Sequence, residues 1–329
     1  MNRFFVLLPV FFVSTPIFCQ STPFFPDEMV VTSNTLIVRE EPNNNAKKIT
    51  TLKLGTVVQF VESWKNGDYI QLDTTDPESP FAPWLKIQFE GKKGWVFGAY
   101  LTSAVGLFYE NDYSFDKRSL PPSYWYGVYA RDSFADEIRM VNVREEEEQS
   151  EMFDTKVGVL KTNQTAVSKF LIASMSPLQP GFCGSLGVFE LNDFFGSSSL
   201  GPGSQMAFYP GNDLSDTLVK PTYGLAATGC AILEEGYVQV HDYKLILLDL
   251  SMEPPIRQDL TTWVKPENTD ISPSVNVLWF GDLDRDNKPD IILQDCPYDA
   301  SCRASLFLSS KARKGELLRK VCEHFWPGD

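Results

Sequence analysis

The chain is poor in histidine, with only His241 and His324 among its 329 residues. An ordinary catalytic zinc site is therefore excluded unless cysteine or carboxylate groups complete its ligand set. A cysteine peptidase also needs a histidine beside its thiolate, and Cys183 is as readily explained as a disulfide partner. No serine stands in the Gly-x-Ser-x-Gly turn that is typical of serine hydrolases. The sequence thus offers no common enzyme signature.

Positive charge is also scarce: 29 Lys and Arg stand against 43 Asp and Glu, which gives a formal net charge of −14. Most of this negative charge falls on residues 105–329. Nucleic acids are recognised through clustered Lys and Arg side chains that contact phosphates, so nucleic acid is excluded as a partner. An acidic domain is instead compatible with divalent cations or with basic partners.

Long apolar runs are absent except near the N-terminus, where Phe4–Val13 follows the cationic Arg3 and precedes a polar break. This pattern is typical of a secretory signal peptide, and the run is too short to span a bilayer comfortably. We expect a signal peptide over residues 1–20 and a proline-rich leader over residues 21–28. No other run approaches the length of a membrane span, so no integral membrane segment is expected.

The end of the signal leaves a second possibility open. If Cys19 carries a lipid, the mature chain is anchored to a membrane surface. Phe18 argues against this alternative, because a bacterial lipoprotein signal usually has a small residue immediately before the cysteine. In both cases the protein is expected outside the cytoplasm, in the periplasm, at the cell surface or in the medium.

Few cysteines remain after the signal is removed. Five of the six survive, so at least one is unpaired. Cys296 and Cys302 lie close together between two expected strands and form the disulfide that we expect. Cys183 with Cys230 is the second pairing considered, and it leaves Cys322 free. A structural disulfide agrees with an exported protein.

Short apolar alternations separated by turn residues run through residues 30–102 and predict a small antiparallel barrel of about five strands. An Arg-x-x-Pro motif at residues 39–42, a Leu-x-x-Gly motif at 52–55 and a Gly-Trp-Val motif at 94–96 follow one another in this stretch. In this order the motifs resemble the bacterial SH3 (SH3b) family. The resemblance covers residues 29–104, which we expect to form one domain.

Many SH3b domains bind cell-wall peptide or glycan through aromatic residues on one face. By this resemblance the ligand-binding candidates are Trp64, Tyr69, Trp84 and Tyr100. Trp64 and Trp84 lie beside loop residues and are expected to be exposed, whereas Trp95 is expected in the core of so small a barrel. Residues 73–83, rich in Asp, Pro and Ser, interrupt a strand where the family has a tight turn. This insertion is expected to enlarge one loop and to reshape the binding face.

Residues 105–329 are expected to form a larger, mostly antiparallel β domain, because apolar runs of strand length alternate with Gly, Pro and Asp. The best helix candidate is Ala312–Phe325. Four consecutive carboxylates, Glu145–Glu148, are expected in a solvated loop or at a hairpin tip. Further strands are expected at residues 138–143, 157–161, 166–173, 187–191, 205–209, 223–233, 237–240, 244–250, 275–280, 291–293 and 305–308.

The most specific chemical pattern is an aspartate-rich stretch, residues 281–290, between two expected strands. It resembles the calcium loops of FG-GAP (integrin-type propeller) repeats. The resemblance implies that Lys288 gives its backbone carbonyl to a calcium ion, and hard carboxylate oxygens suit this ion. The motif occurs once, so no propeller repeat is expected. The side-chain ligands implied are Asp282, Asp284, Asp286 and Asp290.

The loop departs from an EF-hand at two positions: Asn287 stands in place of glycine, and Leu293 in place of an acidic residue. The alternative is a hairpin turn without an ion, in which the carboxylates accept hydrogen bonds from backbone amides. Four carboxylates within one short loop repel one another unless something neutralises them. This repulsion favours a bound calcium ion with a structural role.

The sequence as a whole predicts a mainly β protein, with a small SH3-like barrel followed by a larger, mostly antiparallel β domain. The expected function is non-enzymatic binding of cell-wall peptide or glycan, or of an envelope protein, outside the cytoplasm. The alternative is a cell-wall-active hydrolase with a carboxylate active site in residues 105–329, because SH3b modules often accompany such enzymes and acidic residues are abundant there.

Overall fold

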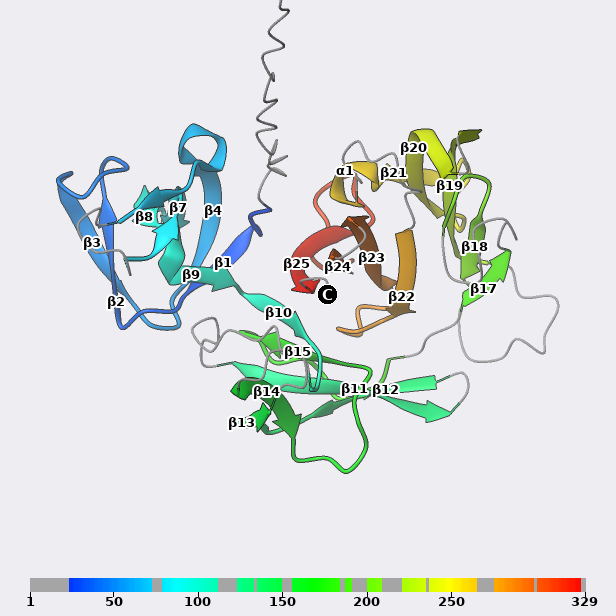
Figure 1. Cartoon of the computed structure of the whole chain (residues 1–329), viewed down its shortest axis with the longest axis horizontal. Coiled ribbons are helices and arrows are strands. Elements are labelled where there is room, and N and C mark those ends of the chain that lie inside the picture. Colours follow the sequence, from blue (N-terminus) through cyan, green and yellow to red (C-terminus); the bar gives the residue numbers. More distant parts are fainter. Residues whose placement is uncertain are drawn as a thin grey trace, which may run out of the picture.

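The computed structural model describes residues 24–72, 79–111, 123–132, 135–149, 156–183, 187–190, 200–208, 221–234, 237–264, 275–298 and 301–326 (Figure 1). Within these ranges almost every element is a strand. Helix is confined there to the single turn α1 (Thr261–Val264) and to the 3-10 turns η1 (Trp64–Gly67) and η2 (Gly98–Tyr100). The expected mainly β fold with antiparallel sheets is confirmed. The expected signal peptide and Cys19 lie outside the described residues.

The N-terminal domain is one seven-stranded antiparallel sheet that curls around its own core. Leu52 and Leu101 pack into the same apolar cluster although their strands stand at opposite ends of the sheet. The sheet must therefore bend round, as a barrel does, and it has seven strands where about five are expected. In sheet order the strands are β3 (Lys48–Lys53), β2 (Thr35–Arg39), β8 (Lys92–Phe97), β7 (Trp84–Phe89), β4 (Val57–Ser63), β1 (Glu28–Val31) and β9 (Leu101–Ser103).

The rest of the chain forms three further antiparallel sheets and a hairpin. The first sheet contains β10 (Val105–Phe108), β15 (Phe170–Ser174), β11 (Tyr124–Asp132), β12 (Ala135–Met140) and β16 (Gly181–Phe182), and the hairpin pairs β13 (Val143–Gln149) with β14 (Lys156–Thr162). The second sheet contains β17 (Gly187–Glu190), β18 (Gln205–Phe208), β19 (Tyr223–Glu234), β20 (Tyr237–Asp249) and β21 (Ile256–Asp259). The third contains β22 (Val275–Gly281), β23 (Asp290–Tyr298), β24 (Ser301–Leu308) and β25 (Arg319–Trp326).

The sheet β22–β25 is the middle layer of this second domain. Successive side chains of a strand point to opposite faces. Here Ile292 packs with the first sheet, whereas Ile291 and Leu293 pack with the second. Figure 1 shows β22–β25 between the sheet that contains β10–β12 and the sheet β17–β21. The unbroken apolar run of β23 is therefore explained by burial on both faces.

A buried polar contact joins the first sheet to the middle one. Asp136 on β12 is 1% exposed and accepts a hydrogen bond from Trp279 Nε1 on β22 at 2.9 Å. Lys169 Nζ forms an ion pair with the same carboxylate at 2.7 Å. A buried carboxylate is costly unless it is paired and hydrogen-bonded. The Trp279 hydrogen bond links the two sheets, and the ion pair with Lys169, which immediately precedes β15 of the first sheet, neutralises the carboxylate.

Two expectations about local structure are wrong. Ala312–Phe325 is not a helix: it contains a turn and then most of β25, which pairs with β24. Gly315 has a φ of +93°, a left-handed conformation that interrupts a helix and favours glycine. Glu145–Glu148 lie within the paired strand β13 rather than in a loop or at a tip. Ion pairs from two lysines of β14 offset the repulsion among these glutamates.

The expected disulfide Cys296–Cys302 is present and links β23 to β24. The second pairing considered is wrong, because Cys183 and Cys230 are both free, as is Cys322. Cys183 is buried, and burial raises the pKa of its thiol to about 12. Only the thiolate is nucleophilic, so burial disfavours the reactive form of Cys183 at neutral pH.

Ion pairs join the N-terminal segment to the turn before β25 and to the first residue of β25. Asp27 pairs with Arg313 at 2.8 Å and with Arg319 at 3.0 Å, and Glu28 pairs with Lys311 at 2.8 Å. We term these contacts the interdomain clamp. Burial by itself raises the pKa of Asp27, but the hydrogen bonds and charges of the two arginines outweigh burial and lower it.

Asp27→Asn removes the charge of the clamp while keeping the shape of the side chain. We expect the free energy of unfolding at neutral pH to fall by about 1 kcal/mol, a modest value because solvent screens the partly exposed pairs. Since the folded-state pKa is lowered, this difference persists above the ordinary value of 3.8 and is lost as the pH falls through the folded pKa. Urea unfolding of both proteins across this pH range measures it. A difference that does not vary with pH contradicts the ion pairing.

Candidate metal centre and ligand-binding face

The acidic loop, residues 281–290, connects β22 to β23 and rests on two other parts of the chain. On one side the Asp282 amide donates to the Cys183 carbonyl at 2.9 Å, and Arg285 Nη1 donates to the Pro180 carbonyl at 3.2 Å. On the other side the loop contacts the serines that follow β24. The loop is therefore held between the first sheet and the β24–β25 connection.

Two residues in the left-handed region shape the backbone of the loop: Arg285, with a φ of 63°, and Asn287, with a φ of 64°. Asparagine tolerates this conformation, so Asn287 serves where an EF-hand has glycine. The Asp282 carboxylate accepts hydrogen bonds from the amides of Asp286 and Asn287, both at 3.0 Å. Asp286 Oδ1 accepts from the Lys288 amide at 2.9 Å. These bonds are those of an aspartate-stabilised turn.

Asp290 and Asp284 differ in how many hydrogen bonds the protein donates to their carboxylate oxygens. Asp290 is 0% exposed, and its carboxylate accepts from the Leu283 amide at 2.7 Å and from the Ser309 amide at 2.8 Å. Asp284 Oδ2 accepts a hydrogen bond from the Ser310 hydroxyl. Asp284 Oδ1 is buried and has no hydrogen-bond partner among the described residues. Burying an unpaired carboxylate oxygen is costly, so a cation at this atom stabilises the loop.

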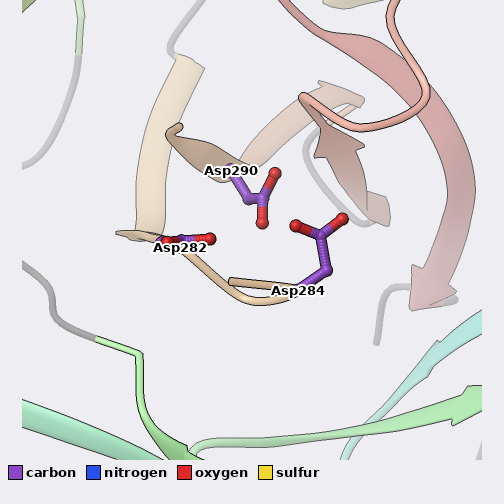
Figure 2. A group of neighbouring side chains, drawn as sticks. All are labelled: Asp282, Asp284 and Asp290. Carbon is purple, nitrogen blue, oxygen red and sulfur yellow. The ribbon is translucent and has the colours of Figure 1, made fainter. Parts of the chain in front are cut away.

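Three carboxylates of the loop come together. Asp282, Asp284 and Asp290 each offer one oxygen, and these oxygens lie within 4.8 Å of one another. Figure 2 shows the three carboxylates gathered around a common space. Asp286 is outside this group, because its Oδ1 accepts hydrogen bonds from the Lys288 amide and from a serine hydroxyl. The structure thus gathers three of the four expected aspartate ligands, and the role of the Lys288 carbonyl stays a prediction.

Burial and repulsion both oppose ionisation in this cluster. Burial, followed by the charge of neighbouring aspartates, raises the pKa of Asp290 well above its ordinary value. Burial is also the main cause that raises the pKa of Asp282 and of Asp284. A divalent cation offsets both effects, because it neutralises the charges and replaces the lost water contacts. Three hard oxygen ligands can therefore hold a metal ion here.

The expected ligand-binding aromatics of the N-terminal domain do not share an exposed face. Trp84 is 3% exposed and packs edge-on against Phe97, with 5.7 Å between ring centroids. The expectation that Trp84 is exposed is therefore wrong. The reason lies in the short hairpin of β5 (Ile70–Gln71) and β6 (Phe81–Ala82), because Ile70 and Ala82 pack in the cluster around this ring.

The remaining candidates divide into two groups. Trp64 and Tyr100 are half-buried around the same aromatic cluster, and so is Trp95, which is expected in the core. Tyr69 is 52% exposed and stacks on Phe81, which is 62% exposed, with 6.0 Å between ring centroids. Phe81 does not emerge from sequence reasoning, although an aromatic residue in a segment rich in Asp, Pro and Ser was an available signal. The β5–β6 hairpin thus covers one group of aromatic side chains, while the stacked rings of Tyr69 and Phe81 stay exposed.

Residues 34–102 match the family described as the bacterial SH3 domain. The matched range lies within the expected domain of residues 29–104. No curated protein and no solved structure shows significant similarity to the chain. No helix in the described ranges is long and apolar enough to cross a membrane.

Trp84→Ala and Tyr69→Ala separate a packing role from a surface role. We expect Trp84→Ala to lower the free energy of unfolding by about 3–5 kcal/mol, because truncating a buried aromatic ring leaves a cavity. Tyr69→Ala is expected to change it by less than about 1 kcal/mol, since its ring is half exposed. Urea denaturation measures both values. Equal stability of the two variants contradicts the burial of Trp84 beneath the β5–β6 hairpin.

Proposed function

Because residues 34–102 are a bacterial SH3 domain, we propose that the protein is an exported binding protein of the bacterial cell envelope. Its SH3 domain contacts cell-wall peptide or glycan. Tyr69 is the principal contact, because its ring is 52% exposed, and the half-buried Trp64 and Tyr100 lie in the cluster behind the β5–β6 hairpin. The match to the SH3 domain carries this proposal.

Export is supported by two features of the chain. The disulfide Cys296–Cys302 is typical of proteins that fold outside the reducing cytoplasm. Residues 1–20 carry the charge and hydrophobicity pattern of a signal peptide. Metabolic labelling with a fatty-acid analogue distinguishes a released chain from one that is anchored through Cys19.

The second part of the proposal is one calcium ion in the acidic loop, held by Asp282, Asp284 and Asp290. Support comes from the convergence of their oxygens and from the buried Asp284 Oδ1 that has no partner among the described residues. Extracellular calcium modules bind with dissociation constants of about 0.1–1 mM, which suits an exported protein. The role of the ion is structural, because Asp290 is fully buried and cannot reach a substrate.

Cell-wall binding is tested by sedimentation of the mature protein with purified bacterial cell walls. We expect the protein to pellet with the walls, and we expect Tyr69→Ala to weaken binding about tenfold because an exposed aromatic contact is lost. Tyr124→Ala is the matched control, since this ring is 46% exposed but lies in the second domain. Protein that stays in the supernatant contradicts the proposal. Release of soluble wall fragments instead supports a hydrolase with a carboxylate site in residues 105–329.

Calcium binding is tested by thermal unfolding of the mature protein with calcium and with a chelator. Because only the folded loop gathers the carboxylates, calcium at ten times its dissociation constant is expected to stabilise the protein by roughly 1.4 kcal/mol. Asp284→Asn keeps the shape but removes the charge, and it is expected to abolish most of this shift. Asp68→Asn, at an exposed position of the SH3 domain, is expected to retain it. No shift at about 10 mM calcium, ten times the weakest dissociation constant of extracellular calcium modules, rules out the site.

A further inference from the structure

A groove of about 710 Å³ lies between the SH3 domain and the second domain. Tyr69 and Phe81 line it from the SH3 domain, and Glu323 and Phe325 of β25 line it from the second domain. The consecutive strands β9 and β10, which carry the chain from one domain to the other (Figure 1), also contribute to its lining. Its volume is within the range of roughly 300–1,000 Å³ that is usual for sites of small ligands.

Three aromatic rings of this groove remain unusually open to solvent. Phe81 is 62% exposed, Phe325 is 53% exposed and Tyr69 is 52% exposed. Aromatic rings that gather at one concave site without being buried indicate a binding surface. Two of the rings, Tyr69 and Phe81, belong to the SH3 domain, and the third belongs to the last strand of the second domain. The site therefore exists only when the two domains lie together.

The charge of the groove selects the class of ligand. Among the described residues that line it, none is Lys or Arg, and the carboxylate of Glu323 is paired with the buried Lys320 Nζ at 2.7 Å. Because this neighbouring ammonium is already paired, an anionic ligand finds no free cation among the described lining residues, and the net charge of −14 repels it. A neutral ligand with one apolar face and several hydroxyl groups fits better, because the face stacks on the rings and the hydroxyls donate to carboxylate and backbone oxygens.

We propose that this groove binds an uncharged oligosaccharide of N-acetylated amino sugars. A sugar ring has an apolar face of C–H bonds that packs on an aromatic ring, while its hydroxyls remain at the edge for hydrogen bonds. The methyl group of each acetamide adds further apolar contact. The inference rests on the proposed cell-wall binding, and it adds that the second domain supplies part of the glycan contact through Phe325.

The test is isothermal titration of the full mature protein with three probes: a tetramer of N-acetylglucosamine, a tetramer of glucose and a cell-wall stem peptide. We expect the first probe to bind more tightly than the other two. Phe81→Ala and Phe325→Ala, one from each domain, are each expected to weaken its binding about tenfold. Tyr124→Ala, a comparably exposed ring outside the groove, is expected to leave the affinity unchanged. Unfolding midpoints confirm that the variants are folded.

Several results overturn the inference. The first is that the tetramer of N-acetylglucosamine does not bind at millimolar concentration. The second is that the glucose tetramer or the peptide binds as tightly as this tetramer. An effect of Phe81→Ala without an effect of Phe325→Ala places the ligand on the SH3 domain alone and also contradicts a groove shared by both domains. These results can be told apart from a failure of the proposed function. If the protein pellets with cell walls but does not bind the tetramer, the proposed wall binding stands and only the glycan-binding groove is contradicted.

Discussion

Burial on both faces of the strands β23 and β24 is the constraint on which the second domain depends. The run from Ile291 to Leu293 must be apolar throughout, and the sheets on either side must present matching apolar faces. Polar groups that enter this layer must then find partners inside the protein. Asp290 does so through backbone amides, and Asp295 does so through two hydrogen bonds from Arg303.

The position of the acidic cluster is set by the end of the middle sheet, where the loop enters β23. Asp290 begins β23 inside the layer, so its carboxylate is enclosed before the loop adds any further charge. The left-handed residues Arg285 and Asn287 then turn the chain so that Asp282 and Asp284 return toward it. The gathering of negative charge is thus an outcome of the packing of the core rather than of an independent surface site. This explains why the same residues both hold the turn and suit a cation.

Features with local signals were predictable from the sequence: the strand alternation, the short Cys296–Cys302 spacing and the aspartate-rich loop. Features decided by distant partners were not. Ala312–Phe325 contains a strand because its backbone forms hydrogen bonds with β24. No local sequence pattern predicts this pairing. Trp84 is buried because the β5–β6 hairpin packs on its cluster. In the same way, the direction of the Asp286 carboxylate and the place of Phe325 in a groove depend on contacts between segments far apart in the chain.

The connection between β24 and β25 touches both the acidic loop and the SH3 domain. Its first residues, Ser309 and Ser310, hold the aspartates, and a few residues later Lys311 and Arg313 reach Glu28 and Asp27. When the SH3 domain is held fast, tension on the second domain passes through this connection as well as along the covalent path from β9 to β10. Because the two domains are joined at two places, both their separation and their rotation relative to each other are resisted.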